Sequence, residues 1–440
     1  MGMILLHLHG LAQGSWVKTA LPTNQFLHAV CFTDSVTGWV AGDSGTMLHT
    51  TDGGAHWVAQ SSGTQNTLAA IFFLNPRLGW ACAYNYQSTP YGTQLLNTTD
   101  GGDHWTSRLY PQENLFMTCI LFLDSLNGWM GGKPNALVRT TDGGLTWTQA
   151  VIDTSILAFF PVLGIKFYNR RIGYACGGMF DIAGVIWRTT DGGNRWSAMD
   201  ASYAPADEVH ALHIFDSLHV IGAGGDPDFG YGVGMIRTAD GGDSWSYQEL
   251  GLQGNAYDIA FRNDSEVWAP LGPQRKMVLS MDGGNTWIPE ETPDSTRIYN
   301  LVFPDSLHGY AIGAAGAFLR YRPRSVGIAP HTGTAGSGYS LGQNLPNPWS
   351  SETLIPFSVP EAGAVTPPGR EAMGKTLYVR IFDLFGRCVV AIPCSDGSPG
   401  RHELTISLEQ LKPGSYFYRM QIGNGDTGIT VSETHLMIKQ

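Results

Sequence analysis

Charged residues are scarce in this sequence, and bases are scarcer than acids. Asp, Glu, Lys and Arg make up 14% of the 440 residues, whereas an average soluble protein has roughly 25%. There are 26 Lys and Arg against 37 Asp and Glu, a formal net charge of -11. Such a chain offers no broad basic face for phosphates, so we predict no nucleic-acid partner.

Long apolar runs and metal-binding cysteine patterns are also missing. No stretch approaches the roughly 20 apolar residues of a membrane-spanning helix, so we expect no integral membrane span. The six cysteines contain no C-x-x-C pair and lie in no cluster with histidine, so we predict no metal site and no cofactor. Disulfides stay possible.

The clearest feature that is present is a repeat with a period of about 45 residues. Six segments of the form [ST]-x-D-G-G-x-x-W occupy 50–57, 98–105, 140–147, 189–196, 238–245 and 280–287. Their aspartates are Asp52, Asp100, Asp142, Asp191, Asp240 and Asp282, and their tryptophans are Trp57, Trp105, Trp147, Trp196, Trp245 and Trp287. Upstream of each lies a second motif of the type FxDSxxGW, and a seventh copy of it follows the last segment, at 303–313.

Each repeat has the pattern of four short strands joined by Gly and Asp turns, which favours a β-propeller with one sheet for each repeat. The seventh repeat lacks a fourth strand, and the strand around Trp16 stands before the first repeat as if to supply it. We therefore predict an all-β chain whose residues 13–324 form a seven-bladed β-propeller closed by its N-terminal strand. Closure would cover two otherwise unpaired sheet edges.

The six aspartates occupy turns between the third and fourth strands of their repeats. A carboxylate there can accept hydrogen bonds from turn N–H groups, while the glycines permit positive φ. The tryptophans are expected to bury their rings between sheets. Because the aspartates lie one to a repeat, we assign them a structural role, although a catalytic or metal-binding role is the alternative.

On these motifs, residues 14–322 resemble Asp-box propellers of the bacterial neuraminidase-repeat type, and most closely the photosystem II assembly and stability factor-like group. The resemblance implies the propeller fold and, as one alternative, an assembly or chaperone role. Two enzyme relatives fit less well. Sialidases need an N-terminal arginine motif, whereas the first arginine here is Arg77, and xyloglucanases need two propellers, whereas this chain has length for one.

The long loops are expected on the face opposite the Asp boxes, where they carry exposed aromatic and acidic residues. Our candidate ligand face consists of Tyr84, Tyr86, Tyr91, Asp181, Tyr203, Asp207, Glu208, Asp226, Asp228 and Tyr231. Such loops over a rigid scaffold suit recognition of a glycan or a protein. Paired acids would also allow a glycoside hydrolase, so that alternative stays open.

The two ends of the chain differ from the repeats. Residues 1–12 are apolar and end in small residues, which predicts the tail of a signal peptide whose start lies upstream, with a first β-strand as the alternative. Residues 325–340 are small, uncharged and glycine-rich, as in a flexible linker. Residues 341–440 alternate strands with Pro and Gly turns, which predicts an immunoglobulin-like β-sandwich.

The last hundred residues resemble the type A sorting domain of the type IX secretion system. The resemblance rests on QNLPNP at 343–348, FSVP at 357–360, YVRIFDLFGR at 378–387 and LKPGSYFYR at 411–419. It implies the type IX machinery as a partner and export through the periplasm of a Bacteroidetes-like bacterium to the outer cell surface or medium. From all this we expect a monomeric, exported binding module for an unknown glycan or protein.

Overall fold

The structure, a computed structural model, describes residues 14–153, 159–179, 181–226, 232–323, 339–360, 377–383, 387–394, 398–407, 411–422 and 429–439. The chain divides into two compact units, residues 1–324 and 325–440. The described residues form strands, turns and short 3-10 helices and contain no α-helix, which confirms the all-β class. The predicted signal peptide at 1–12, and all but the last two residues of the predicted linker, lie outside the described residues.

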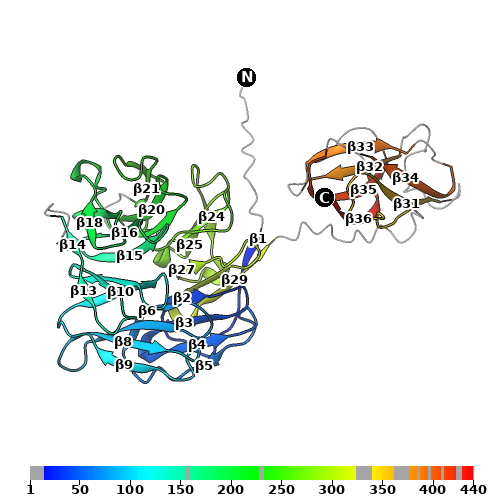
Figure 1. The fold of residues 1–440 in the computed structure, drawn as a ribbon. Coiled ribbons are helices and arrows are strands. Elements are labelled where there is room, and N and C mark those ends of the chain that lie inside the picture. Colours follow the sequence, from blue (N-terminus) through cyan, green and yellow to red (C-terminus); the bar gives the residue numbers. More distant parts are fainter. Residues whose placement is uncertain are drawn as a thin grey trace. The chain divides into compact units, whose positions relative to one another are not determined.

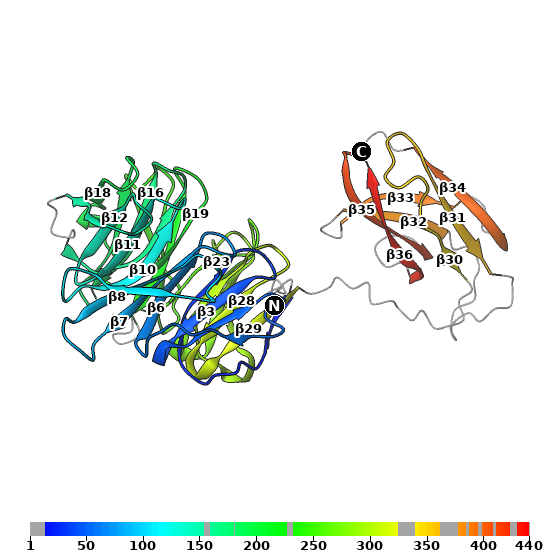
Figure 2. The ribbon, with the colours of Figure 1, turned by 60° about the horizontal axis from the view of Figure 1, so that its bottom comes forward.

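The first unit consists of antiparallel sheets whose strands follow the chain order, and Figures 1 and 2 show these sheets succeeding one another around the unit. The first two sheets are β2 (Leu27–Phe32), β3 (Gly38–Gly42), β4 (Met47–Thr50) and β5 (Val58–Ala59), then β6 (Thr67–Phe73), β7 (Gly79–Asn85), β8 (Gly92–Thr98) and β9 (Thr106–Leu109). The third is β10 (Phe116–Phe122), β11 (Gly128–Lys133), β12 (Ala136–Thr140) and β13 (Thr148–Gln149).

The next three sheets repeat this order. The fourth sheet is β15 (Val162–Phe167), β16 (Gly173–Met179), β17 (Ala183–Thr189) and β18 (Arg195–Ala198), with β14 (Val151–Ile152) added parallel to β18. The fifth is β19 (Val209–Ile214), β20 (Val220–Asp226), β21 (Gly232–Thr238) and β22 (Ser246–Glu249). The sixth is β23 (Ala260–Phe261), β24 (Val267–Pro270), β25 (Lys276–Ser280) and β26 (Ile288–Glu291). Short 3-10 helices lie in the connections, at η1 (Asp43–Gly45), η3 (Ala201–Tyr203), η4 (Gly272–Gln274), η5 (Pro293–Ser295) and η6 (Ala314–Gly316).

The last sheet of this unit joins the two ends of the repeat region. It contains β27 (Ile298–Val302), β28 (Tyr310–Gly313) and β29 (Phe318–Pro323), and its outermost strand is β1 (Gly14–Lys18). β1 pairs antiparallel with β29 over its whole length, from Gly14 opposite Pro323 to Lys18 opposite Leu319. Among the described residues the first unit thus has seven sheets, the last of them built from both ends.

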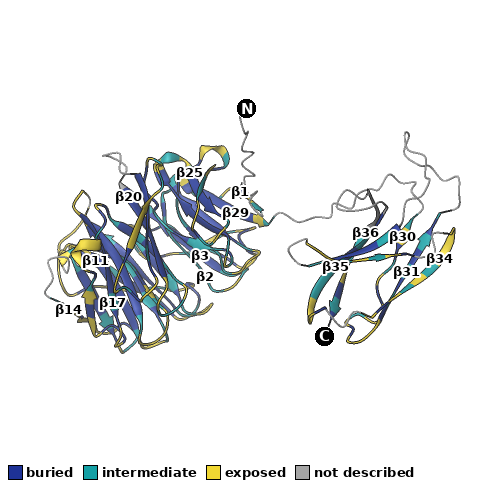
Figure 3. Cartoon of the chain, turned by 90° about the horizontal axis from the view of Figure 1, so that it is seen from above, coloured by how far each residue is buried: buried dark blue, intermediate teal, exposed yellow. Residues whose placement is uncertain are grey.

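Neighbouring sheets are joined by aromatic side chains from their second strands. The Trp39 ring stacks on Phe73 of the next sheet at 3.5 Å, and its Nε1 donates to the carbonyl of Gly101 at 3.0 Å. Trp80 repeats the arrangement with Phe122 and Gly143. The aromatic follows a glycine because a Cβ at Gly38 would lie 2.5 Å from the Phe32 ring. These contacts bury the faces of the sheets, which are dark in Figure 3.

Each Asp box is a closed set of hydrogen bonds around its first threonine or serine. In the third sheet, the hydroxyl of Thr140 donates to Asp142 Oδ1 at 2.7 Å and accepts from the backbone N–H of Gly144 at 2.9 Å. Asp142 accepts from the N–H of Thr146 at 2.8 Å. The hydroxyl and the N–H of Thr146, together with the Thr140 hydroxyl, hold the pKa of Asp142 at about 2, well below its usual range. The same bonds recur at Thr50, Thr98, Thr189, Thr238 and Ser280.

Replacing Thr140 by valine tests this arrangement, because valine keeps the shape and removes the hydroxyl. Thr140 is 2% exposed, so the variant leaves a buried N–H at Gly144 without its acceptor. We expect the free energy of unfolding to fall by roughly 1–3 kcal/mol. Chemical denaturation measures it, with Thr141→Val at the neighbouring exposed threonine as the control. Equal stability of the two variants would contradict a structural role for the box.

The second unit has two sheets around one hydrophobic core. One contains β30 (Ser340–Leu341), β31 (Thr353–Val359) and β34 (Gly400–Ile406), and the other contains β33 (Cys388–Pro393), β32 (Leu377–Phe382), β35 (Gly414–Ile422) and β36 (Ile429–Lys439). Trp349, Ile355, Val379 and Tyr418 are buried between them. The six cysteines of the chain, all of them described, form no disulfide.

Candidate functional site: the mouth of the central channel

A channel of about 290 Å³ runs between the innermost strands of the first unit. Every sheet contributes to its wall. One lining residue from each is His28, Ala69, Thr118, Leu163, His210, Tyr257 and Asn300, where Tyr257 lies just before β23. The channel is therefore a property of the whole ring of sheets, and its lining comes from residues far apart in the sequence.

A β-bulge recurs near the start of six inner strands, and in five of them its extra residue lines the channel. The register shifts between Leu27 and Ala29 in β2, and at the equivalent place in β6, β10, β15, β19 and β27. The extra residue at each shift is His28, Ala69, Thr118, Leu163, His210 and Tyr299. A bulge re-aims a side chain that regular pairing would leave in the sheet. It thus gives each inner strand a residue near the channel end formed by the loops opposite the Asp boxes.

Aromatic rings form an arc along one side of this mouth. Phe26 stacks on His28 at 4.5 Å between ring centres and meets Tyr299 at 4.8 Å. Tyr299 lies 4.8 Å from Tyr257 in an edge-to-face contact, and Tyr257 lies 5.3 Å from His210. These five residues, which we call the aromatic arc, come from four consecutive sheets around the ring.

A glycine permits the close approach of two of these rings. Gly272 in η4 has φ of +51°, and a Cβ on it would lie 2.6 Å from Tyr299 and 2.7 Å from Tyr257. A larger residue at this position would push both rings from their places. The turn thus serves as the back wall of the arc.

Acidic side chains stand beside the arc. Asp43 Oδ1 lies 2.9 Å from His28 Nε2 and accepts from the Thr67 hydroxyl at 2.9 Å. Glu208 Oε2 lies 3.2 Å from His210 Nε2. The mouth therefore combines partly exposed rings with carboxylates. Among the described residues no group of three or more His, Cys, Asp and Glu is arranged to hold a metal ion.

Asp258 lies in the channel wall and joins two sheets. Its Oδ2 accepts from the N–H of Leu301 in β27 at 3.0 Å, and its Oδ1 accepts from the N–H of Ile259 at 2.8 Å. Burial raises the pKa of Asp258, while the Lys166 ammonium and the two N–H groups oppose that rise. Asp258 is thus a bonded part of the wall, and Lys166 supplies its counter-charge.

The predicted ligand-face residues lie in separate places. Tyr84 and Tyr86 cluster with Phe116, on which Tyr86 stacks at 4.4 Å. Tyr91 and Tyr203 are exposed in different loops. Of the predicted acids, Glu208 reaches the channel mouth through its contact with His210.

Two further predicted acids, Asp181 and Asp207, are described by the structure. Asp207 is only 3% exposed, and Asp181 lies in a turn after β16 with φ of +59°. Asp226 ends β20, but its side chain is outside the description, as are Asp228 and Tyr231. Since the side chains of Asp226 and Asp228 are outside the described residues, the glycoside hydrolase alternative stays a prediction.

Sequence reasoning missed Phe26, His28, Asp43, His210, Tyr257, Asp258 and Tyr299. A usable pattern was present. When the repeats are aligned on the phenylalanine or isoleucine at the end of the first strand, the residue four places before it is His28, Ala69, Thr118, Leu163, His210, Tyr257 or Tyr299. Histidine or tyrosine stands at this place in the fifth, sixth, seventh and first repeats, which follow one another around the ring. A channel wall with its binding residues on one side is expected to show this pattern.

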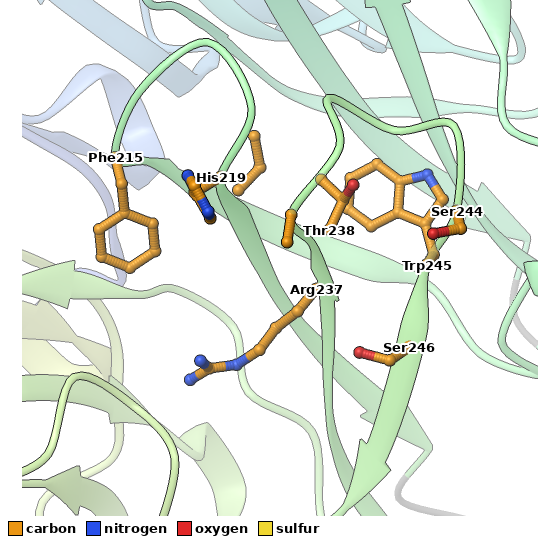
Figure 4. A pocket seen from close by; sticks show the side chains of 9 residues that line it. Phe215, His219, Arg237, Thr238, Ser244, Trp245 and Ser246 are labelled. Atoms are coloured by element: carbon orange, nitrogen blue, oxygen red, sulfur yellow. The ribbon is translucent and has the colours of Figure 1, made fainter.

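A second hollow, of about 510 Å³, lies on the Asp-box side of the sheet β19–β22. Figure 4 shows Phe215, His219 and Arg237 on one side of it and Trp245 with its neighbouring serines on the other. The Arg237 guanidinium donates to the Gly283 carbonyl at 3.1 Å and to Asn285 at 3.2 Å. The Arg237 guanidinium is thus hydrogen-bonded to the Asp box of the next sheet, and we infer that this arginine holds the two sheets together.

Known proteins similar to this chain match mainly its first unit. A family model described as photosynthesis system II assembly factor YCF48 matches residues 9–75, 59–205 and 251–322, more than half of the chain. The photosystem II assembly lipoprotein Ycf48 of Synechococcus sp. (strain CC9902) is 25% identical over 365 residues, covering 74% of this chain and 93% of that protein.

Two solved structures share the fold. "YCF48 bound to D1 peptide" has a TM-score of 0.57 at 21% identity and covers 71% of this chain and 98% of that one. The GH74 enzyme of Niastella koreensis has a TM-score of 0.55 at 13% identity, and the match covers 94% of this chain and 74% of that one. In the described residues, no helix has the length and hydrophobicity needed to cross a bilayer. On the family match, the chain is a β-propeller protein that belongs to the photosynthesis system II assembly factor YCF48 family.

Proposed function

We propose that this chain binds an extended segment of a partner protein at the channel mouth and acts as an assembly factor. The aromatic arc carries the proposal, because partly exposed rings on a rigid frame offer contact area at little cost in side-chain entropy. The family relatives are named for assembly, and one solved relative is bound to a peptide. This assembly role, which was one alternative from the sequence, takes precedence over the exported glycan- or protein-binding module expected there.

The proposal includes the architecture that creates the mouth. The seven sheets are the blades of one closed seven-bladed propeller, with β1 as the closing strand. Support comes from the channel, whose lining draws on the innermost segment of every sheet. Closure keeps the arc rigid, because the sheets that carry Phe26 and Tyr299 meet at the junction of the first and last blades.

Binding of a short-peptide library to the full chain tests the function. Tyr257→Ala and Tyr299→Ala should each weaken binding of selected peptides by at least about tenfold, as expected for aromatic anchors. Tyr168→Ala is the matched control, since Tyr168 is a 48% exposed tyrosine outside both the arc and the predicted ligand face. Selected peptides that bind all three variants as tightly as the unaltered chain would exclude the arc as the site.

We also propose that the second unit is an immunoglobulin-like sandwich that serves as a type IX export signal. The QNLPNP segment supports this, because it fastens the C-terminal strand. Asn347 Oδ1 accepts from the N–H of Ile438 at 2.8 Å, and the N–H of buried Asn344 donates to the Tyr418 hydroxyl at 2.7 Å. The motif thus holds β36 in place, so that this strand forms one defined surface of the unit.

Removal of residues 341–440 tests the export signal. In a type IX-competent host, we expect the full chain at the cell surface or in the medium and the shortened chain folded in the periplasm. Fractionation with limited proteolysis distinguishes these locations. Equal surface delivery of both chains would contradict the assignment, whatever the propeller binds.

A further inference from the structure

We propose that the second unit binds one phosphate group on the outer face of its larger sheet, through Arg380 of β32, Arg419 of β35 and Thr434 of β36. The phosphate is either free in solution or part of a lipid head group, and the experiment distinguishes these two sources. The inference concerns a different unit from the channel mouth and does not depend on what that mouth binds.

The three residues, which we call the arginine row, lie side by side on neighbouring strands (Figure 1). Arg380 is directly opposite Arg419 in the antiparallel pairing of β32 with β35, and Arg419 is directly opposite Thr434 in that of β35 with β36. Side chains alternate between the two faces along a strand, and the adjacent residues Val379 and Tyr418 are buried in the core between the sheets. The arginine row therefore projects from the other face of the sheet.

Each side chain of the arginine row has a buried polar atom without a partner. Arg380 is 7% exposed, and its Nε, the Nε of Arg419 and the Oγ1 of Thr434 are all buried without a hydrogen bond. Within the described part of the chain, no ion pair includes either arginine. A buried guanidinium without an anion is costly, because desolvation penalises the charge. An anionic ligand would supply the missing partner.

Other arginines with a buried Nε show what such a side chain contacts elsewhere in this protein. The Arg237 guanidinium donates to the Gly283 carbonyl at 3.1 Å. Arg262 forms an ion pair with Glu266 at 2.7 Å. Both guanidinium groups are thus bonded by the protein itself. Among the described residues, the two guanidinium groups of the arginine row have no such contact.

Aromatic rings hold these guanidinium groups over the sheet. The guanidinium carbon of Arg380 lies 5.6 Å from the centre of the Tyr378 ring, and that of Arg419 lies 4.5 Å from the centre of the Phe382 ring. Side chains at directly opposite positions start about 5 Å apart, and both are long, so the two groups can reach the same anion. Burial lowers the pKa of Arg419, while Cys388 opposes that shift and the Arg380 charge adds to it. An anion between the arginines would offset their repulsion.

The donors of the arginine row fit phosphate better than carboxylate. Two guanidinium groups carry two positive charges, close to the charge of about −1.5 to −2 on a phosphate monoester at pH 7. Guanidinium binds phosphate oxygens in pairs, and the Thr434 hydroxyl can donate to a third oxygen, which carboxylate lacks. Arg419 and Thr434 are partly exposed, so a ligand can enter from their side. Two arginines suffice for one phosphate, but not for the many phosphates of a nucleic acid.

Calorimetry of the full chain with inorganic phosphate, in a buffer free of phosphate, tests the site. We expect saturable binding of phosphate and weaker binding of acetate at the same ionic strength. Arg380→Met and Arg419→Met each remove a charge but keep a long side chain, and each should weaken phosphate binding by at least about tenfold. Arg401→Met is the matched control, because Arg401 is an exposed arginine of β34, in the other sheet.

Thermal unfolding distinguishes a loss of binding from a loss of folding. Phosphate should raise the temperature at which the second unit unfolds in the unaltered chain and in Arg401→Met, but not in Arg380→Met or Arg419→Met. Without phosphate, Arg380→Met should unfold at no lower temperature than the unaltered chain, because it removes a buried charge that has no partner. Thr434→Val, which keeps the shape, should weaken phosphate binding by about three- to tenfold.

Vesicles of phosphatidylcholine with and without phosphatidic acid identify the source of the phosphate. Binding to phosphatidic acid that is lost in Arg380→Met indicates a lipid head group, and binding of inorganic phosphate alone indicates a soluble one. Equal affinity for phosphate and acetate would overturn the inference, as would phosphate binding that survives in both Arg380→Met and Arg419→Met. A chain that binds neither inorganic phosphate nor phosphatidic acid vesicles would also contradict it.

Discussion

Replacing Glu266 by leucine should lower the free energy of unfolding of this propeller more than replacing any exposed residue. Glu266 is fully buried, and its Oε2 forms an ion pair with Arg262 at 2.7 Å. Its Oε1 accepts from Trp268 Nε1 at 2.9 Å and from the Tyr321 hydroxyl at 2.6 Å. The variant strands a buried guanidinium and two buried donors, which should cost roughly 3–5 kcal/mol of unfolding free energy.

Chemical denaturation measures this loss against two comparison variants. Glu291 forms an exposed ion pair with Lys276 at 3.0 Å, so Glu291→Gln should cost no more than about 1 kcal/mol. Combining Glu266→Leu with Arg262→Leu removes the stranded charge and should recover part of the loss. If Glu266→Leu matches Glu291→Gln in stability, the buried contacts of Glu266 do not stabilise the packing of β24 against β29.

Deleting residues 1–22 is expected to open the ring. The deletion removes β1 and leaves the β29 edge with unpaired N–H and C=O groups, a template for pairing with other chains. It also removes Trp16, which is 8% exposed and contacts Trp268 and Tyr321 at 5.9 and 5.4 Å. We expect aggregation and a lower melting temperature, seen by light scattering and calorimetry.

The control for this truncation is the removal of residues 1–13, which keeps β1. That chain should stay monodisperse with an unchanged melting temperature. Trp16→Ala, which keeps the strand but not the ring, should cost roughly 3–5 kcal/mol of unfolding free energy. A monomeric, equally stable 23–440 chain would contradict closure by β1.

The propeller fold could be predicted because its causes are local and repeated. The DGG turns need glycine at positive φ, as at Gly143 and Gly144, and these glycines are visible in every complete repeat. The pairing of strands in each sheet then follows from short connections between consecutive strands.

The loop-face prediction followed loop length and exposed aromatic content, and it stays a prediction. Tyr84 and Tyr86 pack on Phe116, and Asp207 is buried, so these side chains are used by the fold. His28 and Tyr299 were passed over because each stands in an otherwise apolar strand, where a lone polar or aromatic residue is usually part of the core. Each is the extra residue of a bulge in its strand, and His28 lines the channel.

The sequence by itself determined the repeat, the turns, the pairing of consecutive strands and the family, because these depend on residues close together in the chain. The tertiary structure decided which residues meet at the channel mouth. Phe26 and Tyr299 are 4.8 Å apart, although the whole repeat region separates them in the sequence. Their contact exists because the last sheet returns to the first, and no local pattern of either residue contains that closure.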